Sequence, residues 1–302
     1  MKTKILIGAG LTALSLVLAK KVDLELNLNK GETYAQTMMV ESEIKQTMMG
    51  QTQTINQTIE AKTYLEMIEE SDDSDTYEVW YDNISLAMKT MGQNQNFSSD
   101  TASLATVDPM SKMLNALTGK KFKAQITSKG KVKEVMELEA LVNEATSQMA
   151  GGAQMQEMIQ GSFGNDGLTK NLETTLDIFP DKAVKPGDSW TKVQGTATGL
   201  PLIANTTFTL KSIEGNTATI EVKATLETDP DNATTSMQGM DATLFYEGER
   251  TGTLSMDTET GWVTSGSMND DIVGSITIAP GAQVPDGMTI PVEMKNTMTI
   301  SN

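Results

Sequence analysis

The sequence predicts a mainly β protein in which long antiparallel strands, in two duplicated halves, form a curved sheet or half-barrel packed on a small central helical insert. Three observations predict this fold. Apolar and polar residues alternate with a period of two over most of the 302 residues, which is the pattern of half-buried strands. Helical spacing is limited to residues 108–160. The order of strand patterns before this insert recurs after it, which indicates an internal duplication.

Residues 1–19 have the features of a secretory signal peptide. Lys2 and Lys4 precede an apolar run over residues 5–18, and residues 17–19 (Val-Leu-Ala) offer a cleavage site. The run is too short to span a bilayer, and no later stretch approaches the roughly 20 apolar residues that a membrane helix needs. We therefore expect an exported protein, periplasmic or secreted, without a membrane span.

Residues 20–107 are predicted to form the first β half. The half opens on a strand in which Leu24, Leu26 and Leu28 alternate with polar residues. A turn at residues 30–34 (Lys-Gly-Glu-Thr-Tyr) then leads into a long antiparallel hairpin. The strand after this hairpin changes its parity at residues 82–83 (Asp-Asn), which predicts a β-bulge.

Residues 108–160 are predicted to hold two short helices with a hairpin between them. Asp108 is a good N-cap residue, and Pro109 suits the first helical position. Apolar residues with helical spacing follow at Met110, Met113, Leu114 and Leu117. Alternation over residues 122–135, with a tight turn at residues 128–130, predicts the hairpin. Helical spacing returns at Leu138, Leu141 and Val142.

Residues 161–182 are interpreted as a linker, glycine-rich at its start and ambiguous in secondary structure towards its end. Residues 183–302 form the predicted second β half. Its first strand follows residues 186–190 (Pro-Gly-Asp-Ser-Trp), which repeat the build of residues 30–34: a glycine turn, an acid, a hydroxyl residue and a large aromatic. We expect residues 20–302 to form one domain.

The composition excludes several classes of function. Without histidine or cysteine, the chain cannot build a Ser-His-Asp triad, a thiol nucleophile or the usual zinc and copper sites. A net charge of −17 argues against nucleic acid as a partner. Some carboxylates are candidates for calcium ligands or paired acids, but none has calcium-loop spacing, and we interpret them as solvated turn tips. They are Asp72, Asp73, Asp75, Asp229, Asp231, Asp270 and Asp271. We predict no catalytic residue, metal or cofactor.

Methionine is unusually frequent, with 21 residues against 3 Trp, 5 Tyr and 6 Phe. Its side chain is flexible and polarizable, so it suits irregular packing or a surface that accepts varied apolar partners. An ordinary core filled with methionine is the first interpretation. A groove for lipid or peptide is the second, and a thioether site for Cu(I) is the third.

Several of these motifs together resemble an uncharacterised family of exported bacterial β-rich proteins, known only as a domain of unknown function. They are the leader, the turn at residues 30–34, the Asp108-Pro109 helix start, the turn at residues 128–132, and the run from Phe179 to Trp190. The resemblance covers most of the chain after the leader and implies no activity. The order of long strands around a few helices is also similar, as architecture alone, to the half-barrel of the bacterial outer-membrane lipoprotein carriers.

The leading hypothesis for function is a non-enzymatic exported protein that binds an apolar ligand, such as a lipid or acyl chain, between the curved sheet and the central helices. The candidate ligand-binding residues form the inner face of the helices: Met110, Met113, Leu114, Leu117, Leu138, Leu141 and Val142. The alternative is a structural or protein-interaction module of the cell envelope. A carboxylate-based hydrolase is the third hypothesis.

Overall fold

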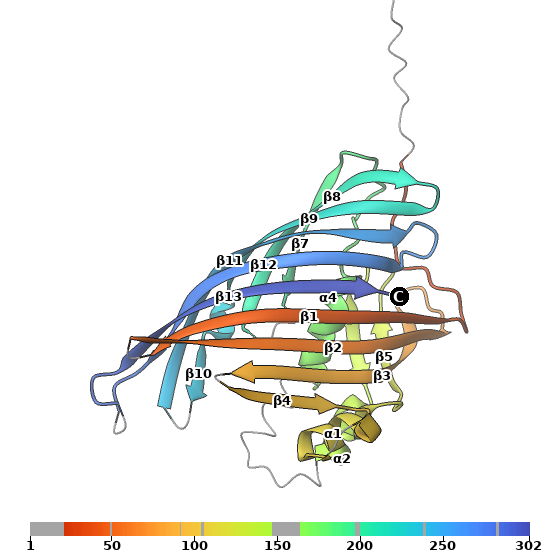
Figure 1. Ribbon diagram of the computed structural model, residues 1–302. Coiled ribbons are helices and arrows are strands. Elements are labelled where there is room, and N and C mark those ends of the chain that lie inside the picture. The colour runs from red at the N-terminus through yellow and green to blue at the C-terminus, as the bar shows by residue number, and fades with distance from the viewer. Residues whose placement is uncertain are drawn as a thin grey trace, which may run out of the picture.

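The computed structural model describes residues 21–48, 50–90, 92–103, 106–146, 164–196, 200–237, 240–281 and 284–302. These residues form a curved antiparallel sheet of 13 strands, with helices packed against it (Figure 1). The predicted fold class, a mainly β protein with a curved sheet on helices, is confirmed. The predicted signal peptide and the part of the second predicted helix after residue 146 lie outside the described residues.

The elements before the second half of the chain are β1 (Thr33–Met48), β2 (Gln51–Glu69), β3 (Asp75–Thr90), β4 (Gln93–Ser98), the short 3-10 helix η1 (Thr101–Ser103), α1 (Pro109–Leu117), β5 (Phe122–Ile126), β6 (Val132–Met136), α2 (Leu138–Thr146) and α4 (Asn165–Leu176). The second half contains β7 (Ser189–Gly195), β8 (Leu202–Glu214), β9 (Thr217–Thr228), η2 (Pro230–Asn232), β10 (Thr234–Met237), β11 (Met240–Asp257), β12 (Val263–Ile278) and β13 (Met288–Ser301).

The strand order places the first and last strands side by side at the middle of the sheet. The order is β6-β5-β3-β2-β1-β13-β12-β11-β9-β8-β7, with β4 beside β3 and β10 beside β11. The first and last strands, β1 and β13, pair over ten residues of each. Both halves therefore contribute to one continuous sheet. The predicted duplication of the halves stays a prediction.

Several local predictions from the sequence are confirmed. The register between β2 and β3 shifts after Asn83, so that Asp82 is the extra residue of a β-bulge. Strands β5 and β6 form the predicted hairpin. In β8, β9, β11, β12 and β13, buried residues alternate with more exposed ones as the period-two pattern indicates; β9 and β13 show this most regularly.

The N-terminal segment before β1 is buried as predicted, but it does not form the predicted strand of the sheet. Leu24, Leu26 and Leu28 are buried, yet this extended segment takes its hydrogen bonds mostly from loops. The backbone N–H of Leu26 donates to the Ser128 carbonyl at 2.7 Å, and that of Asn27 donates to the Thr260 carbonyl at 2.9 Å. The alternation identified an amphipathic extended segment, which here crosses the end of the sheet rather than joining it.

Helix α1 starts as the sequence predicts. The Asp108 carboxylate accepts hydrogen bonds from the Ser111 backbone N–H at 3.0 Å and the Ser111 hydroxyl at 2.7 Å, and Pro109 occupies the first turn. Partial burial raises the pKa of Asp108, but these hydrogen bonds outweigh it and hold the pKa below its usual value. The cap therefore favours the ionised carboxylate in the folded state.

We expect Asp108→Ala to lower the free energy of unfolding by about 1 kcal/mol at pH 7, the usual loss for an N-cap. Because the folded-state pKa is depressed, the contribution of ionised Asp108 is fully present above its unfolded pKa of about 3.9 and is lost as the pH falls through the folded pKa. Urea unfolding at pH 7 and at successively lower pH should show the difference shrinking below about pH 4. Asp72→Ala, in an exposed turn, is the control; equal effects from both variants would contradict the cap.

Helix α4 corrects the prediction that helical structure is limited to residues 108–160. It lies in the stretch that we interpreted as a linker, and its apolar residues Leu168, Leu172 and Leu176 are buried. Their spacing of four is helical. The helix begins after Gly164, which supplies no side-chain hydrogen bond as a cap, so the usual start signal is missing.

Candidate functional site

One face of the sheet is apolar, and we call it the inner face because it packs against the helices. Residues that are direct partners on neighbouring strands share a face, so the registers identify the whole set. The inner face carries two buried hydrophobic clusters. The first cluster includes the helices and the N-terminal segment, with members such as Leu26, Tyr77, Leu114, Leu168 and Met298. The second cluster includes Leu202, Leu226, Tyr246, Ile272, Ile290 and Met294.

A row of mostly polar residues crosses the inner face between these clusters, which we call the polar row. Its members are direct cross-strand partners from one strand to the next. Along the sheet from β7 to β2 they are Lys192, Thr206, Ala224, Arg250, Asp270, Asn296, Ser42 and Gln57. The inner face therefore has a polar belt within an apolar surface.

The centre of the polar row is a buried ion pair. Arg250 donates from Nε to one Asp270 carboxylate oxygen at 2.7 Å and from an Nη to the other at 2.9 Å. The two side chains are 6% and 4% exposed. Arginine suits this position because its planar guanidinium matches a carboxylate with two parallel hydrogen bonds. Our interpretation of Asp270 as a solvated turn tip is wrong, because it lies within β12 on the inner face.

Glycines flank this ion pair and let the two strands approach closely. Residues two apart on a strand share a face, so Gly248 and Gly252 lie on either side of Arg250 and leave room for its guanidinium along the sheet. A Cβ atom on Gly252 would overlap the Ser267 carbonyl oxygen. Directly opposite these glycines, β12 presents large inner-face side chains, with Met268 facing Gly252. A larger residue at Gly252 would push β11 and β12 apart.

Two other members of the polar row are buried without a hydrogen-bond partner. Asn296 is 4% exposed and Thr206 is 2% exposed. Neither the side-chain nitrogen nor the oxygen of Asn296 has a partner, and the Thr206 hydroxyl also lacks one. An unsatisfied buried polar group costs about 1–3 kcal/mol, and such groups are rare in native proteins. These two positions are therefore unusual features of the inner face.

Methionines surround Asn296 on the inner face. Met294 and Met298 lie two residues before and after it on β13, and Met268 is the direct partner of Met298 on β12. All three are buried. Elsewhere in the second cluster, burial raises the pKa of Tyr246 above its ordinary value of 10.0. Tyr246 is therefore uncharged at neutral pH.

Part of the inner face is accessible, on β1, β2 and β3 beside the polar row. We call this part the apolar strip. Ile59 on β2 is 37% exposed, although its direct partners Val40 and Leu86 place it on the inner face. The other apolar residues of the strip are half-buried: Val40, Ile44, Ile55, Leu86 and Met88. Ser42 and Gln57, the half-buried end of the polar row, lie between them.

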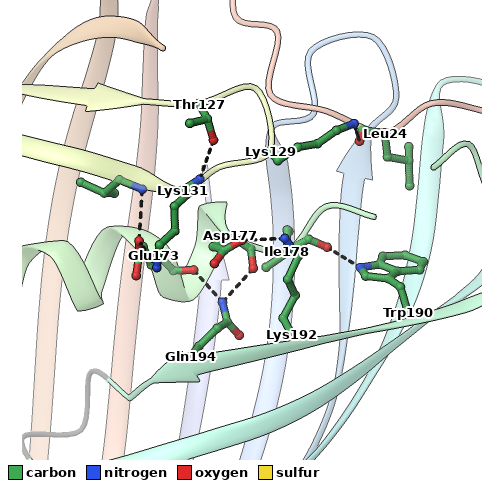
Figure 2. Close-up of polar contacts among 11 residues, drawn as sticks. Leu24, Thr127, Lys129, Lys131, Glu173, Asp177, Ile178, Trp190, Lys192 and Gln194 are labelled. Carbon is green, nitrogen blue, oxygen red and sulfur yellow. Dashed lines mark hydrogen bonds and ion pairs between the residues drawn. The ribbon is translucent and has the colours of Figure 1, made fainter. Parts of the chain in front are cut away.

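Helix α4 joins the two edges of the sheet (Figure 2). Its Glu173 carboxylate accepts a hydrogen bond from the backbone N–H of Val132 on β6 at 3.1 Å. On the opposite edge strand, β7, the Gln194 amide donates to the carbonyls of Glu173 and Asp177, each at 2.9 Å. Lys192 on β7 also pairs with Asp177 at 2.8 Å. The edge strands β6 and β7 are thus both held by one helix, around which the sheet curves.

The seven predicted ligand-binding residues of the helices pack into the first cluster. Helix α1 contacts β3, β4 and α2, and the two helices are seen together below β4 in Figure 1. Five of the seven residues are buried: Met113, Leu114, Leu117, Leu138 and Val142. Met110 and Leu141 are partly buried against the same cluster. Sequence reasoning did not identify the polar row, although Arg250 and Asp270 occupy inward positions of alternating strands.

Asp271 is solvated but is not a turn tip, because it lies within β12 with its side chain 70% exposed. Other carboxylate candidates lie at turns as expected. Asp72 and Asp73 are exposed in the turn after β2, and Asp229 caps the short helix η2 by accepting from the Asp231 backbone N–H. Within the described ranges, no group of three or more acidic residues could hold a metal ion. None of the helices in the described part of the chain has the length and hydropathy to cross a membrane.

Comparison with known proteins identifies a family and a fold. A model described as "Family of unknown function (DUF6263)" matches residues 72–263. No curated protein matches the sequence. The solved structure described as "Lipid-protein interactions in lipovitellin" aligns with a TM-score of 0.50 and 10% identity, over 91% of this chain and 25% of that one. This likeness concerns the fold alone, and the chain spans about a quarter of the length of that protein.

Two further solved structures are much less similar. One is an outer membrane channel from Pseudomonas putida F1, with a TM-score of 0.26 and 7% identity over 91% of this chain and 97% of that one. The other is a DUF1329 family protein from Desulfovibrio piger ATCC 29098, with a TM-score of 0.14 and 7% identity over 89% of this chain and 85% of that one. At these TM-scores the two structures do not share the fold of this chain as a whole.

Proposed function

The chain belongs to DUF6263, a family of unknown function, and we propose that it is a non-enzymatic exported protein whose inner sheet face binds an apolar ligand such as a lipid or acyl chain. The observation that carries the proposal is the apolar strip. Isoleucine on the inner face of a sheet is normally covered by the core, yet Ile59 is 37% exposed there. An acyl chain laid along the strip would bury this surface.

The predicted helix residues keep a role in this proposal. Their buried members hold α1 against β3 and β4 and hold α2 against α1. Met110 and Leu141 are only partly buried, so they keep surface that a ligand could contact. Methionines on the inner face, such as Met88, can adapt to a chain of variable length. The fold is also found in the lipovitellin structure, whose description refers to lipid-protein interactions. This likeness is consistent with a curved sheet that accommodates lipid.

We expect Ile59→Glu to weaken binding of the neutral apolar dye Nile red by at least about tenfold, because a carboxylate on the strip must be desolvated when an apolar molecule covers it. Fluorescence titration of the purified protein measures this. Phe245→Glu is the matched control, since Phe245 is 55% exposed on the outer face and its loss should leave dye binding unchanged. Organic extraction and mass spectrometry would identify a co-purified lipid. A wild-type protein that extracts empty and takes up no dye would contradict the proposal.

A protein-interaction module of the cell envelope is the second candidate, and the outer face favours it. Phe245 and Val273 are exposed there by 55% and 47%. They lie on adjacent strands, and the partner of Val273 is Glu247, two residues from Phe245 on β11. The same two variants separate the candidates: loss of a stoichiometric partner in Phe245→Glu but not in Ile59→Glu would support an interaction surface. A hydrolase has less support, because the described buried acids Glu173, Asp177 and Asp270 are each paired with a cation.

A further inference from the structure

We infer that Asn296 is the binding subsite for an uncharged hydrogen-bonding group of the ligand, so that the ligand is a neutral amphiphile with an amide or hydroxyl group. This inference rests on the proposed function, because it places the apolar part of the same ligand on the apolar strip. It assigns a role to the two polar side-chain atoms of Asn296, which have no hydrogen-bond partner in the protein.

The position of Asn296 connects it to the apolar strip. Ser42 is its direct partner on β1, and Gln57 is the direct partner of Ser42 on β2. Both are half-buried, so the polar row passes from the buried amide to the accessible part of the inner face. Flexible Met294 and Met298 flank Asn296, and unbranched side chains of this kind can move to admit a ligand group.

The two free atoms of Asn296 define the chemistry of the group. A side-chain amide offers two N–H donors and one carbonyl acceptor. Because both its nitrogen and its oxygen lack partners, the complementary group must accept and donate hydrogen bonds together. Amides and hydroxyls do both, whereas a carboxylate or phosphate diester only accepts and a quaternary ammonium does neither. Thr206 is separated from Asn296 by three strands and is not part of this subsite.

The surrounding charges disfavour an ionised ligand. On the neighbouring strand β12, the Asp270 carboxylate is already satisfied by two hydrogen bonds from Arg250. The pair is close to neutral as a unit, so it provides no free cation for an anionic headgroup. A charged group beside it would have to lose its water without a counter-ion. The net charge of −17 further opposes anions.

Competition against bound Nile red tests the inference with four ligands of equal chain length: dodecanamide, dodecan-1-ol, dodecanoate and dodecyltrimethylammonium. We expect the amide and the alcohol to displace the dye at about tenfold lower concentration than either ion, a difference of about 1.4 kcal/mol. In Asn296→Leu this preference should fall below about threefold while dye affinity stays within about twofold. Ser42→Ala, which removes only a half-buried hydroxyl, should reduce the preference partially.

The control is Asn269→Leu, the same change one residue from Asp270 on the exposed outer face, where Asn269 accepts a hydrogen bond from Thr297. It should keep the full preference. Equal displacement by all four ligands in the wild type, or an unchanged preference in Asn296→Leu, would overturn the subsite and leave the apolar-ligand proposal standing. Failure of the wild type to bind Nile red at all would remove both.

Discussion

Asp270→Leu is expected to lower the free energy of unfolding by about 3–5 kcal/mol, the usual loss when one partner of a buried ion pair is removed. The reason is the charge left behind. Arg250 is 6% exposed, and both of the nitrogens that now bind Asp270 would lose their acceptor. The guanidinium would then be a buried group without a counter-ion. Equilibrium unfolding in urea measures the change.

The double variant Arg250→Met/Asp270→Leu should be much closer to the wild type than Asp270→Leu. Two apolar side chains of similar size leave no buried charge and remove the desolvation penalty of the pair. Asp271→Leu is the matched control one residue away, because Asp271 is 70% exposed and lies 3.9 Å from Lys295. Surface pairs of this kind contribute about 1 kcal/mol or less. A large loss in the double variant would show that the pair has a role beyond mutual neutralisation.

The features that the sequence predicted well depend on local chemistry. Asp108 and Pro109 specify a helix start through the hydrogen bonds and φ angle of the first turn. The bulge at Asp82 was visible because one extra residue shifts every following side chain to the other face. Both signals lie within a few residues of the feature that they predict.

The polar row could not be predicted as a unit, because it depends on the lateral order of the strands. Arg250 and Asp270 are 20 residues apart, and Asn296 meets Ser42 only because the last strand pairs with the first. A partial signal was present. Arg250 is the only arginine in the sequence. It is separated by an even number of residues from Tyr246 and Leu254 on β11, so it shares their face, and this spacing indicated an inward position.

Helix α4 was missed for a different reason. Its buried leucines are four residues apart, and this spacing gave a helical signal that the glycines before it weakened. What specifies the helix is tertiary contact with both edges of the sheet: β6 donates to Glu173, and Gln194 on β7 donates to the end of the helix. A helix stabilised mainly by packing carries few start and stop signals of its own.

The contact between α4 and the β5–β6 hairpin predicts the second large loss of stability, from Gly130→Ala. Gly130 lies in the turn between β5 and β6 with φ +80°, and a Cβ atom there would overlap the carbonyl oxygen of Leu176 at the end of α4. Left-handed backbone costs a non-glycine residue about 1–2 kcal/mol, and displacing packed backbone adds about 1–3 kcal/mol. We therefore expect a loss of roughly 2–5 kcal/mol in the free energy of unfolding.

Gly31→Ala isolates the clash from the backbone strain. Gly31 has nearly the same angle, φ +79°, but no atom lies within 4 Å of the added Cβ, so its loss should be limited to about 1–2 kcal/mol. The two variants should also differ in native-state hydrogen exchange at Val132, whose backbone N–H donates to Glu173 of α4. Exchange should accelerate beyond the global effect only in Gly130→Ala, because displacing the turn from α4 opens the contact between the helix and the edge strand. Equal losses and equal exchange would mean that this turn does not hold α4 in place.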